Sequence, residues 1–153
     1  MSAVPVPQIH YRRMRPTDLT EVAHLEKSLY AFPWSLGNFR DSLNAGYDCW
    51  TVTHGETVVG YAVLMIALDE AHLLNVAIAQ EWQGQGIGGG FMRHMIEVAR
   101  GASCQIVYLE VRPSNLAARH LYRKTGFQQI AIRPDYYPAT SGREDALFLG
   151  LSL

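Results

Sequence analysis

The sequence is poor in cysteine, in net charge and in long apolar runs. Its two cysteines, Cys49 and Cys104, each stand beside an apolar stretch, so we expect two free buried thiols in a reduced, cytoplasmic protein and no disulfide framework. We expect no secretory leader, because no charged-then-apolar segment precedes the first predicted strand. The longest apolar run, Tyr61–Leu68, has the length of a buried strand and falls well short of the ~20 residues that span a bilayer.

The formal net charge of -1 gives no overall attraction to nucleic acid or to an anionic membrane surface. The six histidines are scattered without the tight spacing of metal ligands. We therefore expect no metal site, no direct nucleic-acid binding and no membrane association, and any basic site has to be local.

The length of 153 residues and the hydrophobic content of 48% fit one compact domain with a core of its own. Residues 1–8 carry two prolines and little to bury, which predicts a flexible N-terminal arm. A single domain is then expected over residues 9–153.

Hydrophobic periodicity and chain breakers predict the element order β-α-α-β-β-β-α-β-α-β-β, an α+β domain with one βαβ crossover in a mostly antiparallel sheet. The strands are expected at residues 9–14, 49–54, 57–68, 72–79, 106–111, 127–133 and 146–151, with a loop over residues 134–143. The helices are expected from residue 16, from residue 35, from a glycine cluster to residue 101, and over residues 115–124. Asp18 with Glu21 is predicted to cap the first helix, and Ser35 the second.

The glycine cluster over residues 84–90 separates a predicted strand from a predicted helix. Gly84, Gly86 and Gly89 match GxGxxG, with Glu110 ~20 residues beyond, as in a dinucleotide-binding fingerprint. A Rossmann unit is disfavoured, because four residues intervene after the strand and no second mononucleotide half follows. A P-loop is excluded, because no Lys-Ser/Thr pair ends the cluster. Amides without a Cβ at a helix start favour a phosphate site, and a merely flexible start of the helix is the alternative.

Glu110 is the one charged residue of the predicted strand Ile106–Val111. A carboxylate in a buried strand is costly unless it is paired or functional. Pairing with Arg112, or exposure at the strand end, explains Glu110 as well as a catalytic role does. On the residues alone, both interpretations stay open.

The stretch Gln83-Gly84-Gln85-Gly86-Ile87-Gly88 resembles the pyrophosphate-binding motif of the GNAT superfamily, Arg/Gln-x-x-Gly-x-Gly/Ala, and matches it in full. Stretches at residues 75–79, 109–115 and 118–127 are similar to the family in the same order. Within it the chain looks most like the RimI group, the ribosomal-protein-alanine N-acetyltransferases. That likeness rests on Phe32-Pro33-Trp34-Ser35, the Leu-Glu-Val-Arg stretch and Tyr136-Tyr137-Pro138.

The resemblance implies a GNAT fold of three layers, with helices on both faces of a twisted, mixed and mostly antiparallel sheet whose fourth and fifth strands splay apart. It implies acetyl-CoA as co-substrate, with the pantetheine arm filling the splay like an added strand and the pyrophosphate held by glycine amides. Asn115 would bond the cofactor near its pantetheine end. The implied cofactor-binding residues are Val76, Ala77, Ile78, Gln83, Gly84, Gln85, Gly86, Ile87, Gly88, Gly89 and Asn115.

The resemblance also implies catalytic roles. Glu110 corresponds to the general base that takes a proton from the amine, directly or through water. Tyr122 follows Asn115 by two helical turns, so both project from one face, and a phenol can protonate the leaving thiolate. The alternative for Tyr122 is a packing tyrosine with its hydroxyl at the surface. A backbone amide near Ala77 would hold the oxyanion, and His120, a rival acid or base, points about 200° away around the helix.

The implied acceptor is the N-terminal alanine of a protein, in the RimI group a small-subunit ribosomal protein. A terminal amine is favoured over lysine only weakly, by its lower reference pKa. Residues 136–138 either line a peptide channel or pack on the sheet. For Phe32 and Trp34 two positions are likewise possible, in the core or at the rim of the substrate site. The alternatives are a small-molecule amine or lysine acceptor, and a CoA-binding regulatory module, against which Glu110 and Tyr122 together argue.

Overall fold

The computed structural model describes residues 8–153, so the arm expected over residues 1–8 lies, apart from Gln8, outside the described residues. Within that range the strands are β1 (His10–Arg13), β2 (Asp48–His54), β3 (Thr57–Ala67), β4 (Glu70–Ile78), β5 (Ile106–Val111), β6 (Gln128–Pro138) and β7 (Arg143–Ser152). The α-helices are α1 (Leu19–Leu29), α2 (Leu36–Asn44), α3 (Ile87–Gly101) and α4 (Leu116–Thr125). Two short 3-10 helices are η1 (Pro16–Asp18) and η2 (Gln80–Trp82).

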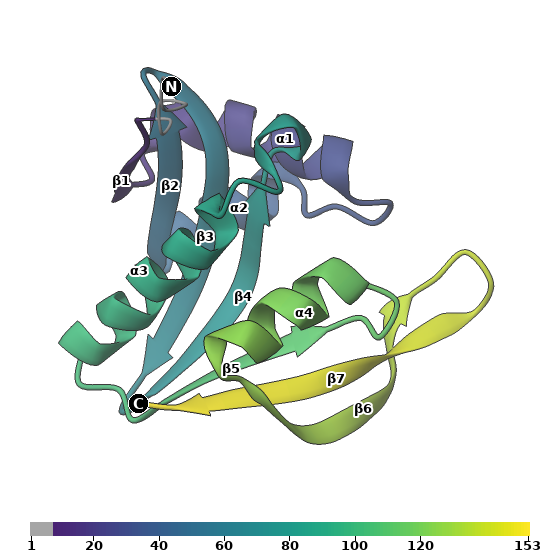
Figure 1. The fold of residues 1–153 in the computed structure, drawn as a ribbon. Helices are drawn as coiled ribbons and strands as arrows, with labels where there is room; N and C mark the ends of the chain where they lie inside the picture. Colours follow the sequence, from purple (N-terminus) through teal and green to yellow (C-terminus); the bar gives the residue numbers. More distant parts are fainter. Residues whose placement is uncertain (1–7) are drawn as a thin grey trace, which may run out of the picture.

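The strands form one sheet in the order β1-β2-β3-β4-β5-β7-β6. Over the described part of the chain, neighbouring strands are antiparallel except β4 and β5, which are parallel and connected through α3. The helices α1 and α2 pack on one face of the sheet, and α3 and α4 on the other (Figure 1). The element order and topology confirm the predicted α+β fold with its single βαβ crossover.

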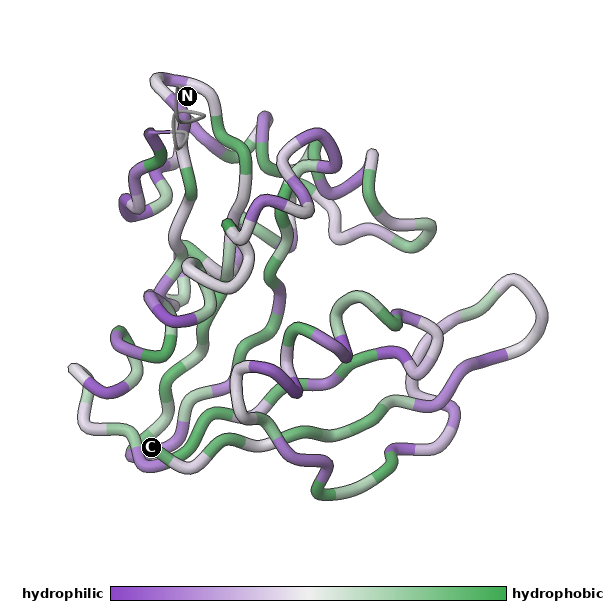
Figure 2. Tube along the Cα trace, in the orientation of Figure 1, coloured by the Kyte–Doolittle hydropathy of each residue, from purple (hydrophilic) through white to green (hydrophobic). Residues whose placement is uncertain are grey.

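The third strand of the sheet, β3, is buried on both faces along most of its length. Tyr61 and Val63 belong to the hydrophobic cluster beneath α1 and α2, whereas Ala62 and Leu64 belong to the cluster beneath α3 and α4. Because alternate side chains of a strand point to opposite faces, a strand covered on both sides needs an uninterrupted apolar run. Hydrophobic residues accordingly follow the strands in Figure 2, while the helices alternate between hydrophobic and polar residues.

The start of α1 differs from the prediction. The Asp18 carboxylate accepts hydrogen bonds from the Arg12 guanidinium at 2.6 Å and from the Arg15 amide at 2.7 Å, and it does not cap α1. Glu21, its predicted partner, accepts instead from the Val58 amide of β3 at 3.2 Å. The predicted box was wrong because an arginine six residues earlier and a strand amide compete for these two carboxylates.

The remaining helix ends follow the predicted signals. The Ser35 hydroxyl caps α2 by accepting from the Asn38 amide at 3.1 Å. The glycine cluster leads directly into α3 at Ile87, and this helix ends at Gly101 as predicted. Gly126 ends α4 with a φ of 111°, a left-handed conformation that favours glycine.

The strands β4 and β5 pair along only part of their length. Their register runs from Glu70 opposite Ile106 to Leu73 opposite Leu109. Beyond that point β4 continues along β3 as far as Ile78 without β5 beside it. The predicted splay between the fourth and fifth strands is thereby confirmed.

The last two strands are longer than predicted and include most of the expected loop over residues 134–143. β6 reaches Pro138 because it is an edge strand, where a residue without an N–H is tolerated. A register shift between Arg133 and Tyr137 takes up the extra residues, and Asp135 within it adopts a φ of 51°. The resulting bend bears on the site, because two tyrosines lie on it.

Both cysteines are free and buried, as predicted. Burial raises the pKa of the Cys49 thiol to about 11 and also raises that of Cys104. No helix of residues 8–153 is both long and apolar enough to cross a membrane.

Candidate functional site

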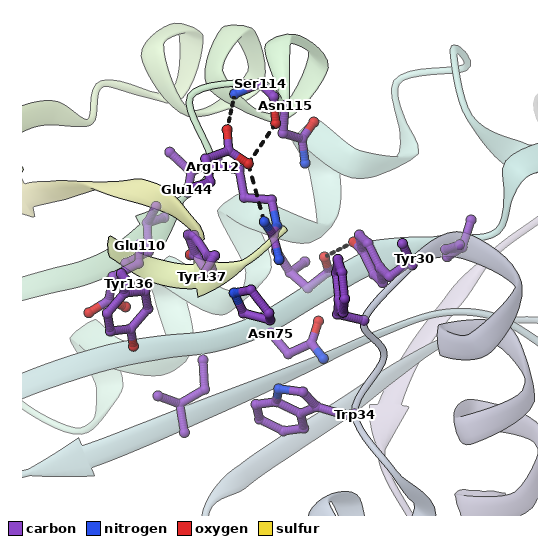
Figure 3. A pocket seen from close by; sticks show the side chains of 18 of the residues that line it. Tyr30, Trp34, Asn75, Glu110, Arg112, Ser114, Asn115, Tyr136, Tyr137 and Glu144 are labelled. Carbon is purple, nitrogen blue, oxygen red and sulfur yellow. Dashed lines mark hydrogen bonds and ion pairs between the residues drawn. The ribbon is translucent and has the colours of Figure 1, made fainter. Parts of the chain in front are cut away.

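A cavity of about 670 Å³ lies where β4 and β5 separate. Its wall is built by the end of α1 and the segment after it, by β4 and β5, by the start of α4 and by the β6–β7 hairpin (Figure 3). The lining side chains that carry polar or ionisable groups include Glu26, Tyr30, Asn75, Glu110, Arg112, Ser114, Asn115, Tyr122, Tyr136, Tyr137 and Glu144. The strand splay thus brings together segments that are far apart in the sequence.

The cavity wall is acidic, since it includes the carboxylates of Glu26, Glu110 and Glu144 but one guanidinium, that of Arg112. Arg112 Nη1 lies 3.2 Å from Glu144 Oε1, and Ser114 donates to the same carboxylate from its amide at 2.9 Å and its hydroxyl at 3.0 Å. These donors, Ser114 foremost, hold the pKa of the Glu144 carboxyl below its usual range. Arg112 is thus paired with Glu144, and the wall contains more carboxylates than guanidinium groups.

Glu110 is held by two basic side chains. Its Oε2 lies 2.5 Å from His72 Nε2 and its Oε1 lies 3.5 Å from Arg133 Nε. The predicted alternative, a pair with Arg112, is wrong, because Arg112 lies past the end of β5 and pairs with Glu144. His72 was not singled out from the sequence, since the parallel register that brings β4 beside β5 leaves no mark in the local pattern of either strand.

Glu26, near the end of α1, is a buried carboxylate of the cavity wall that sequence reasoning missed. Its Oε1 accepts from Tyr61 Oη at 2.7 Å and from Asn75 Nδ2 at 3.1 Å, and its Oε2 accepts from the Trp34 amide at 2.9 Å. It connects α1, β3, β4 and the segment after α1 at the cavity wall. A signal was available, since Glu26 stands four residues after the buried Val22 and so on the apolar face of α1.

Tyr122 and Asn115 both line the cavity from α4, as their spacing predicted. Tyr122 is buried, and burial, followed by the nearby Tyr30 and Tyr137, raises its pKa, so the phenol keeps its proton at neutral pH. The Asn115 Oδ1 caps α4 by accepting from the Ala118 amide at 3.2 Å. Its side-chain NH₂ is left to serve as a donor.

The edge of β4 that faces the splay presents backbone groups. Tyr30 Oη donates to the Val76 carbonyl at 3.4 Å, and Gln83 Nε2 donates to the Ile78 carbonyl at 2.9 Å. Because both backbone groups of a residue point to the same side of an antiparallel strand, the amides of Val76 and Ile78 also face the splay. Ala77, between them, turns its own backbone groups toward β3.

The glycine cluster forms the turn between η2 and α3. Gly84 and Gly86 have φ angles of 76° and 80°, in the left-handed region. Within residues 8–153 no backbone carbonyl accepts from the amides of residues 84–89, and the first amide to find one is that of Gly90, 3.2 Å from the Gly86 carbonyl. A Cβ at Gly84 or Gly86 would meet nothing within 4 Å. The turn therefore has both the free donors and the open space that an anion requires.

Aromatic side chains surround the mouth of the cavity. Arg112 Cζ lies 4.4 Å from the ring centre of Tyr137 and 5.6 Å from that of Phe32, and the rings of Tyr136 and Tyr137 are centred 4.8 Å apart (Figure 3). Trp34 lines the cavity and also packs at the margin of the core. The aromatic residues that the sequence divided between core and rim therefore all reach the cavity.

The other candidates for a functional site were His120 and a metal centre. His120, the rival acid or base, is exposed and is absent from the cavity wall. Among residues 8–153 no group of three or more histidines, cysteines or carboxylates is placed to hold a metal ion.

Residues 14–127 of the chain match the Acetyltransferase (GNAT) family. The chain is 36% identical over 140 residues to the ribosomal protein bS18-alanine N-acetyltransferase of Escherichia coli (strain K12), covering 92% of this chain and 95% of that protein. It is 34% identical over 137 residues to the protein of the same name from Haemophilus influenzae, covering 89% and 93%.

Solved structures agree with this assignment. The crystal structure of the ribosomal-protein-S18-alanine N-acetyltransferase from Escherichia coli superposes with a TM-score of 0.89 at 35% identity, covering 95% of this chain and 94% of that one. The fold alone is shared with Arabidopsis thaliana NAA60 in complex with a bisubstrate analogue, at a TM-score of 0.87 and 18% identity, covering 95% and 98%. The chain therefore belongs to the GNAT family and is an N-acetyltransferase.

Proposed function

We propose that this enzyme transfers the acetyl group of acetyl-CoA to the α-amine of an N-terminal alanine, and that the protein acceptor is a small-subunit ribosomal protein. One observation carries the proposal: Glu110 and Tyr122 line the same cavity, at the splay of β4 and β5, in a wall whose carboxylates suit an ammonium group. The relatives from Escherichia coli and Haemophilus influenzae are named as acetylating the alanine of ribosomal protein bS18, and they match this chain over nearly their whole length.

Two features of the chain fit acetyl-CoA. The backbone groups of Val76 and Ile78 that face the splay suit the amides of a pantetheine arm, which would lie beside β4 as an added strand does. The free amides of residues 84–89 and the open space before them suit a pyrophosphate. Gln83 braces this turn against the end of β4, and Asn115 lines the cavity. Bound there, acetyl-CoA supplies the thioester whose acetyl group is transferred.

Glu110 acts as the general base. An α-ammonium has no lone pair, so it has to lose a proton before the nitrogen can attack, and the Glu110 carboxylate in the cavity wall accepts that proton directly or through one water. The Val76 amide, next to Ala77 and facing the splay, donates to the oxyanion that develops on the thioester carbonyl.

Tyr122 acts as the acid that protonates the leaving sulfur. A thiol has a reference pKa of about 8.5 and a phenol of about 10, and burial raises the pKa of Tyr122 further. The phenol therefore enters the reaction protonated but is a weak donor. When the phenol gives its proton to the sulfur, it has to regain a proton from the attacking nitrogen. That nitrogen becomes acidic as the new N–C bond forms.

The mouth of the cavity suits a peptide that enters by its amino terminus. The rings of Phe32, Tyr136 and Tyr137 surround the opening and offer contacts to the residues that follow the alanine. A lysine nitrogen arrives on a flexible four-carbon stem with a reference pKa of about 10.4, against about 7.7 to 8.0 for a terminal amine. A terminal amine is therefore easier both to position and to deprotonate at Glu110.

The experiment that tests the proposal offers the enzyme acetyl-CoA with a peptide that begins with alanine and carries an internal lysine. We expect the acetyl group on the α-amine alone, located by mass spectrometry of the product. A peptide with a blocked amino terminus and a free polyamine serve as competing acceptors and should react poorly. Label on the lysine, or a polyamine that outcompetes the alanine peptide, would overturn the acceptor and leave the acetyltransferase activity standing.

A further inference from the structure

His72 of β4 contacts Glu110 of β5 across the paired part of the two strands. His72 is in register with Tyr108, two residues before Glu110, so by strand alternation the three side chains lie on the same face of the sheet. His72 Nε2 and Glu110 Oε2 are 2.5 Å apart, the separation of a short charge-assisted hydrogen bond. The sequence motifs of the family resemblance do not include His72.

The two side chains differ in what they face. Glu110 lines the cavity and its side chain is 9% exposed, whereas His72 is not part of the cavity wall and its side chain is 24% exposed. The Glu110 carboxylate therefore lies between the cavity and His72, and the His72 imidazole is in contact with solvent. One hydrogen bond therefore links a side chain of the cavity wall to a side chain that reaches the solvent.

The reaction needs a path for a proton to the solvent, on the proposed function. An α-ammonium carries three protons and the amide product one, so two protons leave nitrogen while the N–C bond forms and the C–S bond breaks. One proton ends on the thiol of CoA through Tyr122, and the other has to reach solvent in every turnover. We infer that His72 takes this second proton from Glu110 and releases it to solvent, which restores the Glu110 carboxylate for the next amine. This inference rests on Glu110 being the base, and His72 acts through Glu110 without touching substrate.

The other groups around the pair cannot replace His72. Arg133 Nε lies 3.5 Å from Glu110 Oε1, but a guanidinium stays protonated and has no acceptor, so it can orient the carboxylate without carrying a proton away. The remaining titratable neighbours, on β4, β5 and β6, are Glu70, Tyr108, Tyr136 and Tyr137. Among these side chains only an imidazole ordinarily gains and loses a proton between pH 5 and 8, as a carrier at neutral pH has to do.

The test compares His72→Gln, which keeps a hydrogen-bond donor beside Glu110 but cannot carry a proton, with His72→Ala and Glu110→Gln. Multiple-turnover acetylation of an alanine peptide, in which Glu110 has to be regenerated in every cycle, is measured from pH 5.5 to 9, after thermal melting shows that each variant is folded. For His72→Gln we expect a rate at pH 7 lower by roughly tenfold, less than the 10²–10⁴-fold effect of a base that meets the amine itself. We also expect the pH profile of His72→Gln to differ from that of the wild type, because the glutamine amide cannot exchange a proton with Glu110.

Added imidazole separates a proton carrier from a structural partner. It should restore His72→Ala, because the site is partly exposed, and should leave Glu110→Gln unchanged. A His72→Gln enzyme with wild-type rate and pH profile would overturn the inference, and so would a slow His72→Ala enzyme that imidazole does not restore. Full activity of Glu110→Gln is a different failure, because it removes the proposed base itself.

Discussion

The Tyr61 hydroxyl of β3 donates a 2.7 Å hydrogen bond to the Glu26 carboxylate of α1, a residue that lines the cavity. Both residues are buried, and Glu26 also accepts from Asn75 and from the Trp34 amide. A buried carboxylate that accepts from several donors is stable. If Glu26 or Tyr61 is replaced, the polar groups that remain are buried without a hydrogen-bond partner.

We expect Glu26→Ala to lower the free energy of unfolding by about 3 kcal/mol, because it strands several buried donors, and Tyr61→Phe to lower it by about 1.5 kcal/mol. Urea denaturation of the two single variants and of the double variant measures both effects and their coupling. If the two losses simply add, the hydrogen bond between Glu26 and Tyr61 contributes nothing to stability. Since Glu26 also positions the segment that bears Trp34, its replacement should raise KM for the peptide.

Alkaline pH should destabilise the protein through its buried tyrosines. Burial, with Glu26 second, raises the pKa of Tyr61, and burial also raises that of Tyr122. A group whose folded-state pKa is raised contributes stability that is full below its unfolded pKa and is lost as pH rises toward the folded value. The unfolding free energy should therefore fall above about pH 10, by up to about 1.4 kcal/mol per pH unit for each such tyrosine.

The thiol of Cys49 adds an earlier loss, between its reference pKa of about 8.5 and its folded value of about 11. Urea denaturation from pH 7 to 11 measures the whole curve. Tyr61→Phe should remove one tyrosine's share of the slope above pH 10 without changing the part below it. An identical slope in wild type and variant would show that Tyr61 does not titrate with unfolding.

Gly86→Val should abolish the binding of acetyl-CoA. The side chain would project into the open space before the free amides of residues 84–89, and the residue has a φ of 80°. Gly46→Val is the matched control, since Gly46 has a φ of 79°, equally open surroundings and no part in the site. Both variants should lose similar stability from backbone strain. In thermal melting, acetyl-CoA should raise the melting temperature of Gly46→Val but not that of Gly86→Val. A cofactor shift in Gly86→Val would place the pyrophosphate elsewhere.

Glu110→Gln should keep the affinity for acetyl-CoA and lower turnover by roughly 100-fold, the scale for a lost general base. The remaining activity should rise with pH, because more of the peptide amine is then deprotonated in solution. Steady-state rates from pH 6 to 9 test this. Glu97→Gln, at an exposed carboxylate of α3, is the control and should behave as wild type. Normal turnover of Glu110→Gln at neutral pH would make Glu110 a structural residue.

Tyr122→Phe removes only a hydroxyl and should leave the fold intact while the chemical step slows by about tenfold or more. Thiol release in a single turnover is the measurement, because slow product release would hide the effect in the steady state. Tyr47→Phe, on the segment between α2 and β2, is the matched control. An unchanged single-turnover rate would remove Tyr122 from the mechanism.

The sequence by itself determined the features that depend on neighbouring residues. The turn at Gly84 and Gly86 follows from the two glycines, since few other residues adopt those φ angles. The strand Ile106–Val111 with its lone carboxylate, and the shared face of Asn115 and Tyr122 on α4, follow from strand and helix periodicity. These predictions needed no knowledge of which element lies beside which.

The tertiary structure alone decided which side chains meet. Two contacts show this: His72 meets Glu110 38 residues further along the chain, and Tyr61 meets Glu26 35 residues before it. Both contacts depend on strand register and on where the helices pack. The sequence likewise suggested Arg112 as a partner of Glu110, but in the structure Arg112 lies past the end of β5 and pairs with Glu144. Local patterns determine the conformation of a segment, whereas competition among distant partners for one buried carboxylate is settled only when the whole sheet and its helices pack together.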